Sequence, residues 1–333
     1  MSGVGIVVIG RNEGERLGRA LDSARAEGVP VVYVDSGSTD GSLDVARGRG
    51  CAVHALDPSR PFSAARARNE GIDELLRRAP GLDYIQLLDG DATLEPGWIA
   101  RARAEMEARP ELCAVLGRLR EARPEASLWI RFCDVEWNLP PGEAHCFGGI
   151  VFLRAAAYRA CGGYDASLVA GEEPELAQRM RRAGGVILSL DAPMATHDAA
   201  MTRFGQWWRR SLRSGHAYAH VCASGRGLAR FGLRQSLRVW AWVPGLVAAA
   251  AALALVHPAG PLAALALLAV QCARVARAVR RRGASPGLAA AYGLFWPVAM
   301  LAQWVGQLRF LARRRSGLIE YKLPAAAREA GPS

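Results

Sequence analysis

The stretch VGIVVIGRNEGERLGRALDSARA, residues 4–26, joins a continuous apolar run to a polar turn and a segment with helical spacing. Residues 4–9 are long enough for a buried strand of a parallel sheet. Apolar residues then recur at intervals of three and four, which predicts a helix over residues 13–26. The order strand, turn, helix is typical of one βα unit in an α/β domain.

The same alternation continues along the chain. Apolar runs at 31–34, 52–56 and 84–88 predict strands, and residues 42–49 and 64–78 predict helices. Strands that alternate with helices of this length indicate a parallel sheet with right-handed crossovers. Because ligands bind at the carboxyl ends of such strands, the residues that follow each apolar run are the candidates for a site.

Polar clusters follow three of these predicted strands, as Gly10-Arg11-Asn12-Glu13, residues 35–41 (DSGSTDG) and Asp89-Gly90-Asp91. Two carboxylates separated by one small residue can share a hard cation such as Mg²⁺ or Mn²⁺, and the glycine allows a phosphate to approach. A solvated turn is the alternative interpretation of the last cluster.

The two aspartates of residues 35–41 are interpreted differently. Asp35 stands at the carboxyl end of a strand, where a carboxylate can accept hydrogen bonds from a base or ribose, and we favour a binding role. For Asp40 we favour turn and helix-capping chemistry, which Ser/Asp/Gly clusters commonly perform.

Charge is divided unevenly along the chain, whose formal net charge is +11. Between Ala199 and Ile319 there are 17 Arg and no Asp or Glu, and this basic part is also the most apolar part. The combination argues against nucleic acid and for a membrane as the partner. Seven scattered cysteines without a C-x-x-C pair, and a beginning without the features of a signal peptide, favour a reducing, cytoplasmic location for the first part.

The apolar part predicts membrane segments. Residues 239–273 contain no Asp, Glu, Lys or Arg and are interrupted by a proline-containing turn, which predicts two transmembrane helices near 239–256 and 262–279. The arginines after the second helix mark its end as cytoplasmic. Residues 283–308 are again uncharged, but arginines flank them on both sides, so a re-entrant or strongly kinked element around Pro297 and a plain third span both remain open.

Six short motifs resemble family 2 glycosyltransferases with the GT-A fold. Four of them match the nucleotide-sugar half and two the acceptor half, and together they cover about residues 3–200. They are residues 7–13 (VVIGRNE), 34–42 (VDSGSTDGS), 67–71 (ARNEG) and 88–91 (LDGD), followed by 162–165 (GGYD) and 171–176 (GEEPEL).

The resemblance implies a GT-A-like, mostly parallel nucleotide-binding sheet with flanking helices, followed by interfacial and transmembrane helices. It implies that Asp91 binds a divalent metal, with Asp89 and His197 completing the site, and His197 has an ordinary polar strand-end role as its alternative. The expected contacts to the nucleotide sugar come from Ile9, Arg11, Glu13, Asp35, Arg68, Asp89 and Gly90.

The expected general base lies in Gly171-Glu172-Glu173. Glu173 falls where the family usually has an aspartate, so the assignment between Glu172 and Glu173 stays open, and dipole complementation at a helix start is the alternative. Pro174 favours the first turn of a helix here. An acceptor hydroxyl that loses its proton to this base would attack the anomeric carbon and invert its configuration.

Residues 202–238 mix tryptophans with arginines and predict an amphipathic helix in the membrane interface. Within them, residues 206–210 (QWWRR) are similar to the Gln-x-x-Arg-Trp motif of membrane-bound polysaccharide synthases, with Arg210 in place of the final Trp. Gln206, Trp207 and Arg209 are therefore expected at an acceptor or at the lipid interface.

We thus predict four parts: a catalytic domain (1–200), an interfacial region (201–238), a membrane region (239–315) and a tail (316–333). The predicted function is metal-dependent, inverting transfer of a sugar from a nucleotide-diphosphate donor to a lipid-linked or surface-glycan acceptor at the cytoplasmic face of the membrane. A nucleotidyl- or phosphosugar-handling enzyme and a non-catalytic membrane scaffold that binds nucleotide sugars are the alternatives. The sugar, base, linkage, processivity and oligomeric state are left open.

Overall fold

The structure is a computed structural model that describes residues 3–313 except 138, 169 and 224–228. The described residues form two compact units. The first contains residues 3–124 and 136–200, and the second contains residues 125–135 and 201–313. Each unit is described by itself.

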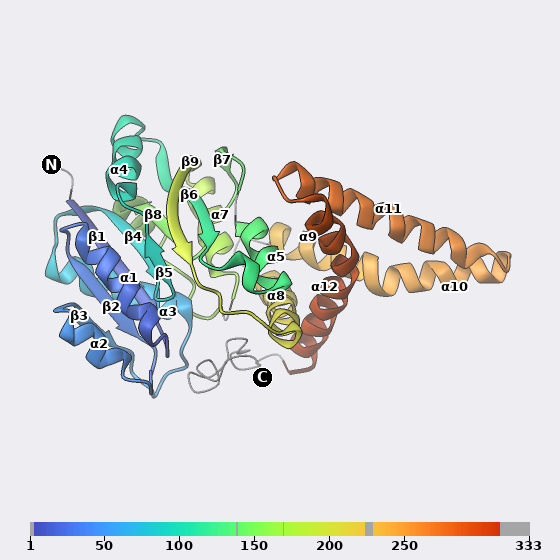
Figure 1. The fold of residues 1–333 in the computed structure, drawn as a ribbon, viewed down its shortest axis with the longest axis horizontal. Helices are drawn as coiled ribbons and strands as arrows, with labels where there is room; N and C mark the ends of the chain where they lie inside the picture. Colours follow the sequence, from blue (N-terminus) through green and yellow to red (C-terminus); the bar gives the residue numbers. More distant parts are fainter. Residues whose placement is uncertain (1–2, 138, 169, 224–228, 314–333) are drawn as a thin grey trace. The chain divides into compact units, whose positions relative to one another are not determined.

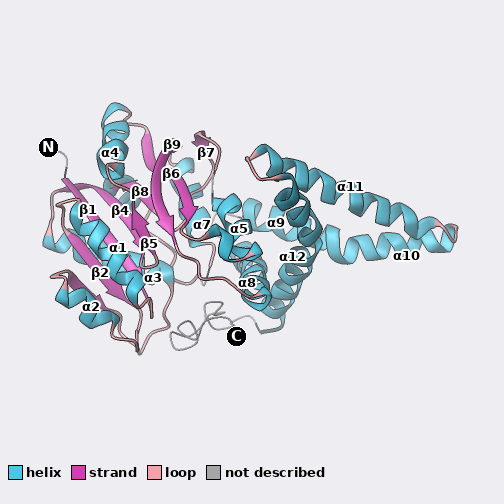
Figure 2. Cartoon of the chain, in the orientation of Figure 1, coloured by secondary structure: helices cyan, strands magenta, loops and turns pink. Residues whose placement is uncertain are grey.

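Four parallel strands form one side of the sheet in the first unit (Figure 2). Their order is β3 (Ala52–Ala55), β2 (Val31–Asp35), β1 (Gly3–Gly10) and β4 (Leu82–Asp89). These are the four strands predicted from the apolar runs, and β1 is buried at every position between its two ends.

Beyond β4 the sheet becomes mixed, which confirms an α/β fold but confines the purely parallel part to the first four strands. Strand β8 (Val151–Arg154) pairs antiparallel with β4 and with β6 (Leu112–Glu121). Strand β9 (Val186–His197) pairs parallel with β6 and antiparallel with β5 (Ala92–Leu94) and β7 (Gly142–Ala144). Reversed strands were not visible in the sequence because apolar runs look alike in either direction.

Helices cover both faces of the sheet (Figure 1). Helices α1 (Glu15–Ala26) and α2 (Ser42–Gly48) lie on one face, and α3 (Ala64–Arg78) lies on the other, as right-handed crossovers require. The remaining helices of the first part of the chain are α4 (Trp98–Ala108), η1 (Pro124–Ala126), α5 (Leu128–Trp137), α6 (Ala155–Ala160) and α7 (Glu172–Arg182).

The strand register aligns the polar residues at the ends of β1, β2 and β4. Gly10 at the end of β1 pairs with Asp35 on β2, and Ile9 pairs with Asp89 on β4. Neighbouring strands lie about 4.8 Å apart, so Asp35 and Asp89 are about 10 Å apart across β1. The fold therefore gathers the three polar clusters at one edge of the sheet.

The second unit is helical (Figure 1). Helix α9 (Ala229–Trp240) leads through a π-helical turn, η2 (Ala241–Gly245), into α10 (Leu246–Val256). The other helices that lie wholly in this unit are α8 (Phe204–Ala223), α11 (Gly260–Arg281) and α12 (Pro286–Arg313).

Three stretches of this unit are long and apolar enough to cross a membrane: Phe231–Val256, Gly260–Arg281 and Pro286–Ala312. The first begins earlier than residue 239, because α9 continues into the predicted span. The expected interfacial region 201–238 consequently holds two helices and part of a span, and the expected tail at 316–333 lies outside the described residues.

The third of these stretches contains the proline considered above. Helix α12 runs from Pro286 to Arg313 with Pro297 inside it.

Candidate active site

The loops after β1 and β2 are tied to each other. The backbone N–H of Asn12 donates to Oγ of Ser38 at 3.0 Å, and Oδ1 of Asn12 accepts from the backbone N–H of Thr39 at 2.7 Å. Asn12 has φ +54°, a left-handed conformation that asparagine tolerates better than most residues. Asp40 accepts from Ser42 and from the backbone N–H of Gly14, which is the turn chemistry favoured for it.

Asp35 is buried at the end of β2 and is engaged in local bonds. Its carboxylate accepts from the hydroxyl of Tyr33 at 2.9 Å and from the backbone N–H groups of Gly37 and Ser38. Burial, together with the charge of Asp35, raises the pKa of Tyr33, so this phenol stays protonated and donates to Asp35. Asp35 thus shapes the turn, and its remaining lone pairs are what a base or ribose could use.

The end of β4 packs closely against the end of β1. The backbone N–H of Gly90 donates to the carbonyl of Ile9 at 2.7 Å, and a Cβ at Gly90 would stand 3.1 Å from that oxygen. Glycine is the residue that fits this approach without displacing the backbone. Arg11 of the adjacent turn is exposed and lies over the ring of Phe62 at 5.6 Å.

Arg68 of α3 joins three of the predicted site carboxylates. Its Nη1 donates to Glu172 at 2.9 Å and to Glu173 at 3.2 Å, and its Nη2 donates to Asp89 at 3.1 Å. Burial alone would lower the pKa of Arg68, but Glu173 and Asp89 raise it above its usual value. Arg68 is therefore a fixed positive charge between the end of β4 and the start of α7.

Residues around Arg68 that sequence reasoning missed hold it in place. A Cβ at Gly149 would collide with the guanidinium of Arg68 and stand 2.6 Å from Oδ2 of Asp89, so a side chain there would push into this ion cluster. The ring of Tyr164 lies 5.6 Å from Arg68, and Asn69 bonds both backbone polar groups of Tyr164. The quoted motifs at 67–71 and 162–165 contained Asn69 and Tyr164, whereas nothing in the sequence marked Gly149.

The two candidate bases lie at the first turn of α7. The helix begins at Glu172 after Gly171, whose φ is +86°, and Pro174 is in the first turn as expected. The Glu172 side chain is 4% exposed, whereas that of Glu173 is 19% exposed. An incoming acceptor would therefore reach Glu173 more readily.

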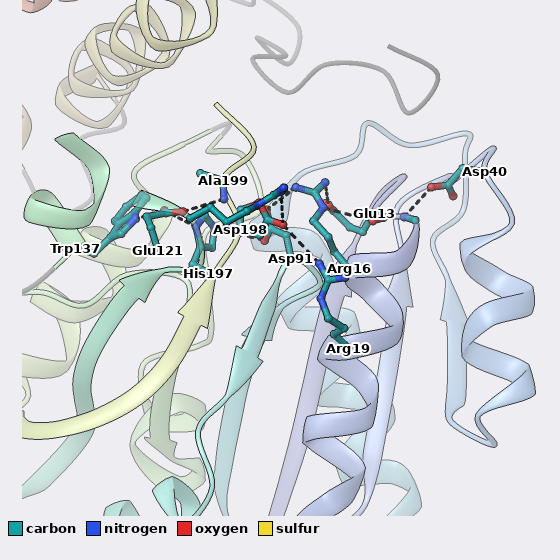
Figure 3. Close-up of polar contacts among 12 residues, drawn as sticks. Glu13, Arg16, Arg19, Asp40, Asp91, Glu121, Trp137, His197, Asp198 and Ala199 are labelled. Atoms are coloured by element: carbon teal, nitrogen blue, oxygen red, sulfur yellow. Dashed lines mark hydrogen bonds and ion pairs between the residues drawn. The ribbon is translucent and has the colours of Figure 1, made fainter. Parts of the chain in front are cut away.

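Asp91, which lies between β4 and β5, faces His197 at the end of β9 (Figure 3). Oδ1 of Asp91 lies 3.5 Å from Nε2 of His197, and Nδ1 of His197 lies 2.8 Å from Oε1 of Glu121. Glu121 also accepts from the indole N–H of Trp137 and the backbone N–H of Ala199, and its side chain is 1% exposed. Because a carboxylate only accepts, Nδ1–H of His197 donates to Glu121, and the other ring nitrogen, Nε2, faces Asp91.

A second buried ion pair borders Asp91. Arg16 of α1 contacts Glu13 at 2.5 Å, donates to the backbone carbonyl of Asp198, and lies 4.0 Å from Asp91 (Figure 3). Glu13 is thus paired with Arg16 in the first turn of the helix that follows it. Neither Arg16 nor Glu121 was predicted, because an arginine in a helix and a glutamate in a strand carry no motif by themselves.

The donor set suits a divalent ion with two protein ligands. The carboxylate of Asp91 and Nε2 of His197, which lie 3.5 Å apart, would both be available to a divalent ion, and diphosphate oxygens would supply further ligands. Asp89 is turned toward Arg68. Among the described residues there is no group of three or more His, Cys, Asp or Glu side chains arranged to hold a metal.

The three predicted residues of the second unit have different surroundings. Oε1 of Gln206 accepts from the backbone N–H groups of Thr202 and Arg203 and so caps the start of α8. Trp207 is 4% exposed and packs within 5.0 Å of the Trp129 ring, which favours a packing role over stacking on a sugar. Arg209 is exposed.

The mixed sheet with flanking helices is that of the GT-A glycosyltransferases. A mannosyltransferase from Pyrobaculum calidifontis, solved with GDP-Man and Mn²⁺, has this fold with a TM-score of 0.58 and 21% identity, over 92% of this chain and 86% of that chain. Residues 5–146 match the family model described as Glycosyl transferase family 2.

Two curated relatives are similar in sequence. They are the pre-mycofactocin glycosyltransferases of Mycobacterium tuberculosis strains CDC 1551 / Oshkosh and H37Rv, each 25% identical over 228 residues. The match covers 65% of this chain and 47% of each relative, so the chain spans about half the length of the curated relatives it matches.

Proposed function

We propose that this protein is an inverting glycosyltransferase that moves a sugar from a nucleotide-diphosphate donor to a lipid-linked or surface-glycan acceptor. The observation that carries the proposal is the contact of Arg68 with Asp89 at the end of β4 and with Glu172 and Glu173 at the start of α7. The guanidinium of Arg68 thus holds the end of β4, where the sugar donor would bind, beside the two candidate bases.

The donor would bind at the level ends of β1, β2 and β4. Gly90 lets the end of β4 pack closely against the end of β1, and the neighbouring Asp91–His197 pair could hold a divalent ion. Such an ion, when bound, would neutralise the charge that develops on the leaving nucleoside diphosphate. The fold relative that was solved with GDP-Man and Mn²⁺ makes this donor and this ion the first to test.

Glu173 is the proposed base because it is the more exposed of the two glutamates. It takes the proton of the acceptor hydroxyl while the acceptor oxygen bonds to the anomeric carbon. The bond from that carbon to the diphosphate breaks on the opposite side, its electron pair leaves with the nucleoside diphosphate, and configuration inverts. Arg68 keeps the carboxylate oriented during this step.

The second unit supports a membrane location for the acceptor. It contains three stretches that are apolar enough to span a bilayer, and its arginines cluster at their ends. Arginine-rich ends favour the cytoplasmic side, so the proposed site works at the cytoplasmic face of the membrane.

Product analysis tests the proposal. The purified full chain in detergent, incubated with GDP-mannose or UDP-glucose, Mn²⁺ and a membrane lipid extract, should release the nucleoside diphosphate together with a glycosylated lipid or glycan. Release of pyrophosphate would instead indicate a nucleotidyl-transferring enzyme. Donor binding with no product from any acceptor fraction would indicate a scaffold and contradict the proposal.

A further inference from the structure

Helix α12 crosses α8 with the two backbones in contact. A Cβ at Gly306 would collide with the carbonyl of Leu212 and stand 2.8 Å from the backbone nitrogen of His216. A Cβ at Gly215 would likewise collide with the backbone of Gln303. Only glycine permits this approach, so the two helices are held side by side at this point.

The contact extends along both helices in the same direction. Phe295 of α12 packs on Trp207 near the start of α8, and Phe310 packs on His216 about two turns further along α8. Helix α8 is not apolar enough to span a bilayer and exposes Arg209. An arginine away from a helix end is costly to place in hydrocarbon, which favours a position of α8 outside it with α12 alongside.

Two contacts of α12 relate it to the charged ends of the neighbouring helices. A Cβ at Gly293 would stand 2.7 Å from the carbonyl oxygen of Cys272 in α11, which lies two residues before Arg274 and five before Arg277. Fourteen residues later, Gln307 accepts from the indole of Trp240, two residues after Arg238. Both contacts are at the charged ends of the neighbouring apolar helices, so α12 runs from one charged end to the other.

The surface of α12 also differs from that of the other two stretches. In its most apolar window 39% of residues are buried in protein, against 6% and 11% in the other two. Three leucines of α12 are exposed, Leu294 by 72%, Leu301 by 42% and Leu311 by 57%, and Arg309 near its end is exposed as well. On the protein side it buries Gln303 and Gln307.

We infer that α12 lies along the membrane interface, with its leucine strip against lipid and α8 on the water side, and that the chain crosses the bilayer twice. The crossings are the Phe231–Val256 and Gly260–Arg281 helices. Residues 239–256 span about 27 Å at 1.5 Å per residue, close to the thickness of the hydrocarbon core. With two crossings, the arginines at 280–282 and at 309 all stay on one side, as the positive-inside rule favours.

Reporters on the two ends of the full chain test the number of crossings. Green fluorescent protein, which fluoresces only in the bacterial cytoplasm, is fused to either end and compared with alkaline phosphatase, which is active only outside it. Two crossings predict fluorescence and no phosphatase activity at both ends. Opposite results at the two ends would mean an odd number of crossings and overturn the inference.

Two controls complete the test. A known transmembrane helix placed between Ser333 and the reporter should invert the readout at that end. The Ala259→Cys variant, in the turn between α10 and α11, should react with a membrane-impermeant maleimide on intact cells, whereas the wild type should not. Absence of labelling at position 259, with cytoplasmic reporters at both ends, would show that α10 and α11 do not cross and would also overturn the inference. None of these readouts depends on sugar transfer, so they can fail while the proposed function holds.

Discussion

A single buried guanidinium links the two halves of the proposed chemistry. Arg68 contacts Asp89, Glu172 and Glu173 within 3.2 Å, and removing it would leave three carboxylates without their shared cation. Loss of one partner from a buried ion cluster lowers the free energy of unfolding by about 3–5 kcal/mol. A loss of activity after truncation of Arg68 would therefore not separate an effect on folding from an effect on catalysis. The neighbouring carboxylates are better probes.

The two glutamates can be separated by matched substitutions. Glu173→Gln should lower kcat by about 10²–10⁴-fold, as loss of a general base does, while donor binding measured by thermal shift stays intact. Glu172→Gln is the control, because its side chain is 4% exposed and cannot meet the acceptor as readily. A larger loss of kcat in Glu172→Gln than in Glu173→Gln would reverse the assignment.

Glu121 is predicted to act as a positioning residue through His197. In Glu121→Gln the amide can donate to Nδ1, which moves the histidine proton to Nε2, the nitrogen that faces Asp91. Mn²⁺ affinity, measured by electron paramagnetic resonance on the full chain, should fall by about 10–100-fold.

The control for Glu121 is Glu111→Gln, at the exposed entry to β6, which should leave Mn²⁺ affinity unchanged. Equal affinity in Glu121→Gln and the wild type would show that Glu121 does not orient a metal ligand. The Glu121→Asp variant, which keeps an acceptor-only side chain, should recover part of the affinity.

Sequence alone located the residues that stand directly after strands. Asp35, Asp89 and Asp91 follow this rule, because parallel strands bring their carboxyl ends to one edge. The glutamates of α7 follow a loop and were indicated only by the resemblance to a family motif. Arg16, Glu121 and Gly149 could not be found this way. Their roles depend on pairing between segments far apart in the chain, such as Glu121 with His197, which periodicity does not reveal.

Elements with a strong period were predicted well. Helix α3 begins and ends at the predicted residues 64 and 78, because a capping serine precedes it and apolar residues recur along one face. The direction of β8 was not predictable, since antiparallel pairing leaves no mark on a short buried strand. The course of α12 through Pro297 was also open, because a proline lowers the expectation of a helix that packing can still stabilise.

The glycine contact between α8 and α12 gives a prediction about the stability of the helical unit. Gly306→Ala should destabilise the helical unit by about 1–3 kcal/mol, because its Cβ would meet the α8 backbone, which cannot rotate away. Gly287→Ala, on the same helix with no atom within 4 Å of its Cβ, should be neutral or stabilising. Thermal unfolding in detergent compares them, and equal melting temperatures would contradict the close crossing.

At the scale of the molecule, one chain combines an α/β unit, which matches the family 2 glycosyltransferase model over residues 5–146, with a helical unit rich in arginine and apolar residues. The separation was visible in the sequence, because Asp and Glu are absent between Ala199 and Ile319. The assignment of residues 125–135 to the helical unit was not, because it depends on the packing of Trp129 and Phe132 with Trp207 and Phe295.

Membrane integration is the prediction for the whole chain. After alkaline carbonate washing the protein should stay with the membrane pellet, and detergent should release it, because apolar helices such as α10 expose leucines and valines that need lipid. Leu255 and Val256 are 91% and 84% exposed in the protein alone. Recovery in the carbonate supernatant would show peripheral attachment and contradict transmembrane crossing.

The most direct test of the central claim is donor binding by the wild type and Asp91→Asn, which keeps the size of the side chain and removes its charge. With Mn²⁺ present, one nucleotide sugar of a panel should raise the melting temperature of the wild type by an amount that grows with the logarithm of its concentration. The same donor should stabilise Asp91→Asn no more than it stabilises the wild type in the presence of a chelator. Equal stabilisation of both proteins in Mn²⁺ would mean that Asp91 does not hold a metal–diphosphate pair, and the proposed site would be wrong.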